Sequence, residues 1–362
     1  MFGKEVAFGV FDQTRTRAVR EQTQAIAVSL TKRLDDCLQQ ALPEAPAKSI
    51  KRIIAEVVPK TAAFAPALTV GELEGKLNRH HLTLVAVAVG CMYIADQLID
   101  RGDEKMLYAI EGLPFPASNP RENILVHMRE AIGMLALKDD GPLVLECFEQ
   151  NVLRNEARLH RLSSEYYGLD EQNQQTFLNQ HAGELAVLMV EDAGFQSITS
   201  SLHAVYRQHD GSLPSIKELH NDPAIARIIQ ICNAAARIAD EYGDWWMDAG
   251  NDPRYGVFSI NPFNQYHPVM IETFCQLGGI ENAEDITGIQ AAFKKFHTSK
   301  AEQLASGMFI TEKFFDQMRQ CIMIYRTTHG HNHPFTTYIT LCMRVGEISL
   351  INMMGDITLA DV

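Results

Sequence analysis

Apolar residues recur at helical spacing along most of the chain, three and four positions apart, with polar residues between them. Segments with the alternating period of a β-strand are scarce, and Gly and Pro stand mostly between the periodic segments. The pattern therefore predicts an all-α protein, folded as a helical barrel or bundle. The expected helices cover residues 15–42, 46–58, 72–102, 121–137, 141–166, 170–200, 215–249, 267–278, 286–306, 310–327 and 334–354.

Sequences that end helices separate several of these segments. The clearest combine Gly, Pro, Asp or Ser at positions 112–116, 139–142, 209–212 and 278–279. No segment has the composition of a linker, and the chain contains no internal repeat or low-complexity tract. We therefore expect a single helical domain over residues 71–362, with residues 1–70 as an N-terminal helical extension that packs on it.

The longest uncharged apolar run covers residues 82–95. A helix needs about 20 apolar residues to cross a bilayer, so this run predicts a buried core helix and no transmembrane segment. The N-terminus lacks the features of a secretion signal. The seven cysteines are odd in number and include no CxxC pair, which is typical of free thiols in a reducing compartment. These features predict a cytoplasmic protein.

Composition and charge narrow the range of partners. Hydrophobic residues make up 46% of the chain and charged residues 21%, which is too apolar for a disordered protein. Lys and Arg number 32 against 45 Asp and Glu, and no stripe of basic residues could neutralise several phosphates. A nucleic-acid partner is therefore not expected. The net charge of −13 would also repel an anionic small substrate unless cations lay between the two.

Two series of aspartates spaced four residues apart each follow an apolar helical segment. The first ladder is Asp96 and Asp100, and the second is Asp240, Asp244 and Asp248. Four residues is about one helical turn, so the carboxylates of each ladder share one face. Like charges at this spacing weaken a helix unless a cation binds them, and Mg²⁺ is the hard cation that takes carboxylate oxygens together with phosphate oxygens. The ladders therefore predict a magnesium-diphosphate site, while a solvated acidic face is the alternative.

The ladders resemble the metal-binding motifs of the class I isoprenoid synthase superfamily, which has the all-α terpenoid synthase fold. The segment 96–100 is similar to the first aspartate-rich motif, with Gln97 where many members have a second Asp. The second ladder has the spacing of the second motif of terpene cyclases, where Asn, Ser or Thr, and Glu are usual. The resemblance implies a terpene synthase that ionises a prenyl diphosphate to an allylic cation. It also implies that Asp96, Asp100, Asp240, Asp244 and Asp248 hold the Mg²⁺, three ions together with the diphosphate.

The candidates for contact with the diphosphate match the family pattern only in part. Tyr325-Arg326 is similar to the C-terminal Arg-Tyr pair of terpene cyclases, in reversed order. The segment 191–195, where those cyclases carry a diphosphate-sensing Arg, contains none. Arg237 and Arg101 are our candidates to replace it, and an ordinary ion pair is the alternative for each.

A second resemblance, to squalene and phytoene synthases, is carried by Asp240, Asp244 and the helix segment 181–186. It implies condensation of two prenyl diphosphates. We favour the cyclase because Asp248 completes a third position and because the expected lead-in to that helix is missing at 179–180. A non-catalytic all-α scaffold with solvated ladders is the non-enzymatic alternative, and homodimerisation is left open.

Other candidate ligands are weaker. His329, His331 and His333 could supply zinc ligands, but a solvated or capping loop is favoured because no fourth ligand lies nearby. We expect the pair His80-His81 to be partly buried packing and Asp35-Asp36 to be surface charge. Aromatic residues that could face a carbocation are more often plain core; they are Tyr93, Tyr242, Trp245, Phe315, Tyr325 and Tyr338.

Overall fold

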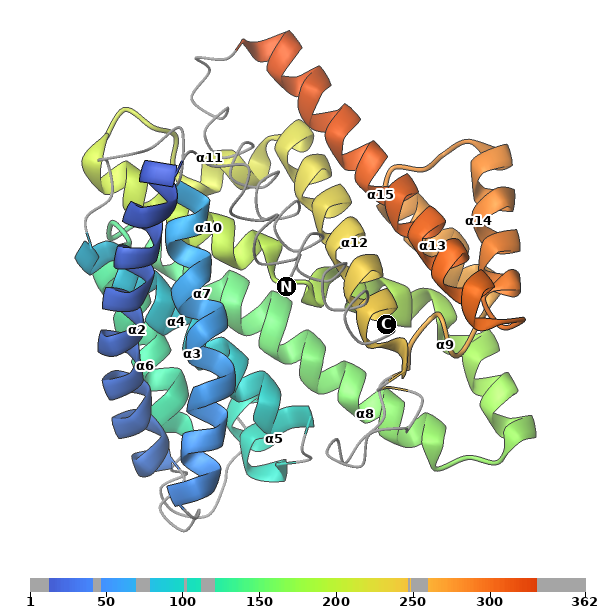
Figure 1. Cartoon of the computed structure of the whole chain (residues 1–362), viewed down its shortest axis with the longest axis horizontal. Helices are drawn as coiled ribbons and strands as arrows, with labels where there is room; N and C mark the ends of the chain where they lie inside the picture. Colours follow the sequence, from blue (N-terminus) through green and yellow to red (C-terminus); the bar gives the residue numbers. More distant parts are fainter. Residues whose placement is uncertain are drawn as a thin grey trace. The chain divides into compact units, whose positions relative to one another are not determined.

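The structure, a computed structural model, describes residues 13–41, 47–69, 79–100, 103–111, 121–246, 248 and 260–330. Within these ranges the chain is helical nearly throughout and contains no β-strand, so the predicted all-α class is confirmed (Figure 1). The helix predicted at 334–354 lies outside the described residues.

The described helices fall into two compact units, each of which is described by itself. The α4 unit covers described residues within 13–154 and 196–221, and the α12 unit covers those within 155–195 and 222–330. The α4 unit contains α2 (Gln13–Ala41), α3 (Ala47–Thr69), α4 (Arg79–Asp100), α5 (Glu104–Glu111), α6 (Glu122–Leu135), α7 (Gly141–Phe148), the π-helical η1 (Glu149–Arg154), α11 (Ile216–Asn221) and all but the first residue of α10 (Phe195–His209). The α12 unit contains α8 (Asn155–Tyr167), α9 (Glu171–Asp192), α12 (Pro223–Trp246), α13 (Pro268–Leu277), α14 (Ala283–Lys295) and α15 (Lys300–His329).

Helix α4 is the core of its unit. Every residue from Leu82 to Met92 is buried, because the helix is apolar on all sides and α2, α3 and α6 pack around it (Figure 1). Helix α4 is long and apolar enough to cross a membrane, but 83% of its most apolar window is buried inside the structure. The prediction of a buried core helix is confirmed. Because α2 and α3 pack on α4 within one unit, the boundary at residue 70 stays a prediction.

Helices α12 and α15 lie side by side and antiparallel in the α12 unit (Figure 1). Near the end of α12, the Tyr242 hydroxyl donates a hydrogen bond to the Leu304 carbonyl oxygen in the second turn of α15, at 2.9 Å. A Cβ atom added at Gly307 would lie 1.9 Å from the Tyr242 ring. The break predicted between 306 and 310 is therefore wrong, since Gly307 makes room for this ring inside a continuous helix. The break lies before Lys300, where the Ser299 hydroxyl accepts the Glu302 N–H.

Two other predicted helices are divided in the structure. The segment 170–200 breaks after Asp192, and Gly194 adopts φ 71, a conformation that glycine allows without steric cost. The segment 215–249 breaks at Asp222, whose side chain accepts the Ala224 N–H at 2.8 Å, and α12 begins at Pro223. Proline is preferred at the first helical position, so this start was readable from the sequence.

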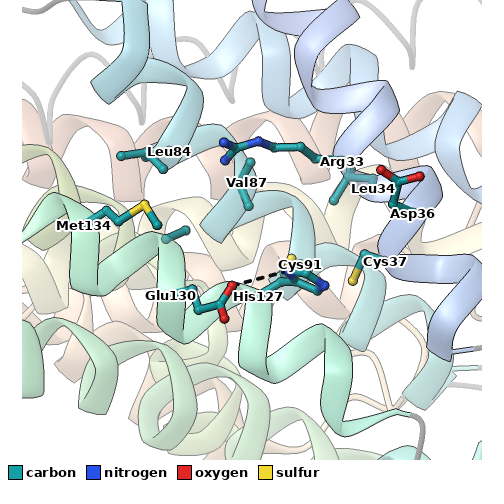
Figure 2. Close-up of a pocket in the computed structure, with 11 residues that line it drawn as sticks. Arg33, Leu34, Asp36, Cys37, Leu84, Val87, Cys91, His127, Glu130 and Met134 are labelled. Atoms are coloured by element: carbon teal, nitrogen blue, oxygen red, sulfur yellow. Dashed lines mark ion pairs between the residues drawn. The ribbon is translucent and has the colours of Figure 1, made fainter.

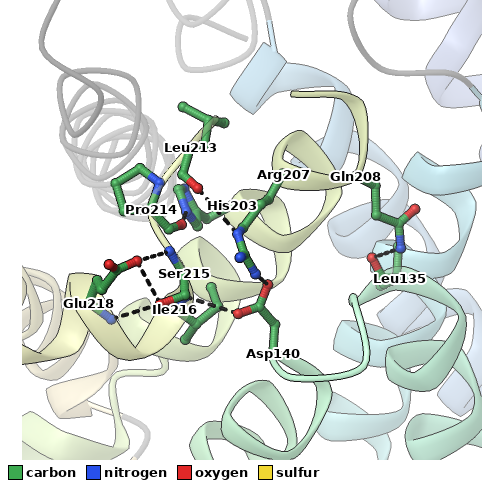
Figure 3. A network of polar contacts seen from close by, with 10 residues as sticks. All are labelled: Leu135, Asp140, His203, Arg207, Gln208, Leu213, Pro214, Ser215, Ile216 and Glu218. Carbon is green, nitrogen blue, oxygen red and sulfur yellow. Dashed lines mark hydrogen bonds and ion pairs between the residues drawn. The ribbon is translucent and has the colours of Figure 1, made fainter. Parts of the chain in front are cut away.

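A buried carboxylate fastens α7 to the connection between α10 and α11 in the α4 unit. Asp140 is fully buried and lies 2.5 Å from Arg207 Nη1, and its other oxygen accepts the Ile216 N–H at 3.0 Å (Figure 3). Arg207 also donates to the Leu213 carbonyl, and the His203 ring contacts the Pro214 carbonyl at 2.8 Å. One side chain immediately before α7 therefore anchors a turn about 70 residues further along the chain.

Replacing Asp140 by Asn is expected to lower the free energy of unfolding of the α4 unit by about 2 kcal/mol, because the charge-assisted bond to Arg207 is lost. The control is Asp139→Asn, since Asp139 is the neighbouring exposed aspartate and should change stability by less than about 0.5 kcal/mol. Urea unfolding followed by circular dichroism measures both. Equal midpoints for the two variants would contradict the anchoring role.

Candidate functional site

The first ladder lies in the last turns of α4, in the α4 unit. Asp96 and Asp100 are both half-buried and stand one turn apart after the buried apolar run, as the sequence pattern indicated. Each has an interaction partner within the structure. Arg101 lies outside the described residues, so its predicted role in substrate binding stays a prediction.

The second ladder lies at the C-terminal end of α12, in the α12 unit. The Asp240 side chain is 54% exposed, and Asp248, just beyond the helix, accepts a hydrogen bond from Asn261 Nδ2 at 2.9 Å. Asp244 is on α12 between them, and its side chain lies outside the described set. The two ladders belong to different units, and each is described within its own unit.

Arg237, one turn before Asp240, is enclosed by carboxylates. Its Nε lies 2.6 Å from Glu241 Oε1, and its Nη1 lies 3.3 Å from Asp192 Oδ2 and 3.7 Å from Asp240 Oδ2. The side chains of Arg237, Asp192 and Glu241 are 15%, 5% and 2% exposed. Arg237 is therefore held in ion pairs in this structure, and its predicted contact with a diphosphate stays a prediction.

The carboxylates around Arg237 outnumber it. Glu156 on α8 and Asp248 also interact electrostatically with the guanidinium. We call the group the Arg237 cluster; its members are Arg237, Glu156, Asp192, Asp240, Glu241 and Asp248. Burial by itself would lower the pKa of Arg237, but Glu241, Asp192 and the other carboxylates raise it above its ordinary value. The guanidinium therefore stays charged, and the cluster as a whole carries an excess of negative charge.

The pKa of Asp248 is shifted first by burial and then by its charged neighbours. Burial is the largest cause that raises its pKa, to about 6, and the negative charges of Asp240 and Glu156 raise it further. The hydrogen bond from Asn261 and the charge of Arg237 act in the opposite direction without cancelling the rise. An additional cation beside Asp248 would remove this penalty.

Carboxylate oxygens are the donor class that Mg²⁺ takes, and in this respect the second ladder fits the metal. The described residues nevertheless contain no group of three or more His, Cys, Asp or Glu side chains arranged to hold one metal ion. In some Mg²⁺ sites the ion keeps waters and takes one or two carboxylates plus substrate phosphate oxygens, so such a site does not require three protein ligands.

The pair Tyr325-Arg326 lies at the far end of α12 from the second ladder. Burial is the main cause that raises the pKa of Tyr325, and Asp222, which precedes α12, adds to the rise. Asp222 and Asp240 are separated by about 27 Å along the helix axis at about 1.5 Å per residue. The structure does not bring this pair to the ladder, and its role in diphosphate binding stays a prediction. His329 stacks on Tyr325, while His331 and His333 lie outside the described residues.

The aromatic candidates near the ladder pack on other aromatic rings. Tyr242 contacts Phe263 and Phe296, and Trp245 meets Phe296 edge to face at a centroid distance of 5.1 Å. Tyr242 is buried, so it belongs to the core, as expected for an aromatic residue at helical spacing.

A small cavity lies between α2, α4 and α6 in the α4 unit (Figure 2). Its volume is about 240 Å³, below the roughly 300–1,000 Å³ of typical ligand pockets. The buried thiols of Cys37 and Cys91 line it, and the pKa of Cys91 is raised by a hydrogen bond with Cys37 and by burial. Protonated buried thiols are poor nucleophiles. With a volume of about 240 Å³, the cavity is too small to be the chamber of a long prenyl chain.

Sequence reasoning missed three residues that shape the second ladder: Asp192, Glu241 and Asn261. Asp192 ends an apolar run just before the Gly194 break, a signal for a buried acid that needs a partner. Glu241 lies one turn after Arg237, the spacing of a helical ion pair. Asn261 follows residues outside the described set, and no local pattern pointed to it.

Comparison with family models, with curated proteins and with solved structures finds no match to this chain.

Proposed function

We propose that this chain is a Mg²⁺-dependent terpene synthase that ionises a prenyl diphosphate and releases diphosphate, acting in the cytoplasm. The observation that supports the proposal is the charge imbalance at the end of α12, where the single guanidinium of the Arg237 cluster is set against five carboxylates. An excess of negative charge that includes the two buried carboxylates of Asp192 and Glu241 is unfavourable in a folded protein unless a cation offsets it. The proposal rests on this site and on the motif spacing of both ladders.

In this proposal some residues bind Mg²⁺ and others hold those ligands in position. Asp240, Asp244 and Asp248 would be Mg²⁺ ligands at the second ladder, and Asp96 and Asp100 would be Mg²⁺ ligands at the first. The bound ions would supply Lewis-acid stabilisation of the leaving diphosphate. Arg237 would fix Asp240 in place through their ion pair, and Asn261 would orient the Asp248 carboxylate.

The first test is product formation from single prenyl diphosphates of increasing length, with Mg²⁺ and with excess EDTA. We expect diphosphate release and a hydrocarbon or alcohol containing one substrate's carbons, and no release in EDTA. A product with twice the carbons would assign the chain to the squalene and phytoene type. Absence of release with every chain length would overturn the proposal and favour a scaffold.

Thermal unfolding gives a second test that needs no substrate. Mg²⁺ with inorganic diphosphate should raise the unfolding temperature, since a ligand that binds only the folded state stabilises it by about 2.7 kcal/mol at 100 times its dissociation constant. Mg²⁺ alone or diphosphate alone should give a much smaller shift, because each needs the other at the ladders. An equal shift with diphosphate alone in Mg²⁺-free buffer would point to an ordinary anion site.

A further inference from the structure

Two histidines from distant parts of the sequence meet on the surface of the α4 unit. His81 is in the first turn of α4, and His209 is the last residue of α10. His209 Nε2 lies 3.2 Å from His81 Nδ1, and the rings meet edge to face with centroids 5.0 Å apart. The pair His80-His81 was expected to be partly buried packing, and no local pattern indicated that His209 would join it.

This separation of ring nitrogens matches the spacing of two ligands on one metal ion. Zinc binds imidazole nitrogen at about 2.0–2.1 Å in tetrahedral geometry, which places two such nitrogens about 3.3 Å apart. At most one of the two facing nitrogens carries the hydrogen that lies between them, so the other offers a lone pair. A metal ion bound to both nitrogens would lie to one side of the line between them, so each ring would turn by about 35° from its present direction.

The surroundings allow an ion to enter from solvent. His209 and His80 are exposed and His81 is half-buried. The His80 ring centroid lies 5.9 Å from that of His81. Arg79, the nearest cation in sequence, donates its Nη2 hydrogen to the Ala25 carbonyl oxygen at 3.2 Å. Burial and the neighbouring His209 and His80 lower the pKa of His81, which leaves its ring uncharged at neutral pH.

We propose that His81 and His209 bind a divalent transition-metal ion, with Zn²⁺ as the best match, and that water completes the coordination. Imidazole suits zinc, copper and nickel, whereas Mg²⁺ takes oxygen ligands, so this site is separate in chemistry from the ladders. The proposal does not depend on the proposed function. It would join the first turn of α4 to the last turn of α10 through the metal.

The test is a titration of the full chain with Zn²⁺ in competition with a chromogenic chelator. We expect wild type to bind one Zn²⁺ more tightly than His209→Ala does, by at least tenfold, and His81→Ala to show the same loss. His297→Ala is the matched control, because His297 is an exposed histidine that is not part of the His81–His209 site. This variant should bind Zn²⁺ like wild type. Since His209 is exposed, its variant tests the site even if His81→Ala perturbs the packing of α4.

Two outcomes would overturn the proposal. One is identical zinc affinity and stoichiometry in wild type, His81→Ala and His209→Ala. The other is loss of the zinc only in His331→Ala or His333→Ala, which would place the ion at the C-terminal histidines. Thermal unfolding gives an independent measurement: Zn²⁺ should raise the midpoint of wild type and of His297→Ala, and should leave that of His209→Ala unchanged.

Discussion

Replacing Arg237 by Met is expected to lower the free energy of unfolding of the α12 unit by about 3–5 kcal/mol at neutral pH. Methionine can fill much of the same space, so the expected loss comes from charge and not from a cavity. The substitution would leave the carboxylates of Asp192 and Glu241, which are 5% and 2% exposed, without their cation. Urea unfolding followed by circular dichroism measures the change.

The same unit offers a matched control on its surface. Arg158 forms an ion pair with Glu184, and their side chains are 62% and 35% exposed. Arg158→Met should cost less than about 1 kcal/mol, because exposed ion pairs contribute little. A similar loss in both variants would show that burial does not set the strength of the Arg237 pair.

The pH dependence gives a further check on Arg237→Met. Carboxylates left buried without a cation hold protons more tightly in the folded state than in the unfolded chain. The folded variant then binds more protons at neutral pH, and its stability must fall as pH rises. We therefore expect the deficit relative to wild type to shrink between pH 7 and pH 5. The triple variant Arg237→Met, Asp192→Asn, Glu241→Gln should recover much of the loss, because the two most buried carboxylates of the cluster are then neutral.

The helical character of this chain could be predicted because it depends on local periodicity. Helix α4 was recognised from one apolar run, since a segment that is apolar on all sides has to be buried. The positions at which helices end were harder to predict from the sequence. A break was predicted between 306 and 310, yet Gly307 lies inside α15 because the Tyr242 ring needs the space of a missing Cβ. That reason is a tertiary contact between positions 65 residues apart, which a local pattern does not contain.

The candidate site could be predicted only along single helices. The spacing of Asp240 and Asp248 was readable from α12 and its continuation, as was the position of Arg237 one turn earlier. The partners that hold these residues come from other segments: Asp192 from α9, Glu156 from α8, and Asn261 from the segment before α13. The meeting of His81 with His209 was missed for the same reason, since 128 residues separate them.

The Asp248→Asn variant is expected to lose at least about 100-fold in the rate of diphosphate release while its fold becomes more stable above pH 6. The two effects have one cause. Burial raises the pKa of Asp248 to about 6, so the ionised carboxylate is unfavourable in the folded protein when no cation accompanies it. The neutral amide removes that cost, keeps an oxygen to accept the hydrogen bond from Asn261, and cannot supply the charge that Mg²⁺ needs.

The direction in which stability changes with pH follows from the pKa of Asp248 in the folded and in the unfolded chain. In the unfolded chain Asp248 loses its proton near its ordinary pKa of 3.8, whereas the folded protein keeps the proton up to about 6. Between these values the folded wild type binds more protons, so Asp248 lowers stability as pH rises, by about 3 kcal/mol at most. Asp248→Asn should therefore exceed wild type in stability at pH 8 and match it near pH 4.

Asp316→Asn is the control for both measurements, because Asp316 is an exposed residue of the same unit that pairs with Arg319 on α15. It should change neither diphosphate release nor the pH dependence of unfolding. Full activity in Asp248→Asn would remove Asp248 from the metal site, whereas lower stability than wild type at pH 8 would show that the charge of Asp248 supports the fold. A gain in stability together with a loss of turnover is the combination that a metal ligand predicts and a structural carboxylate does not.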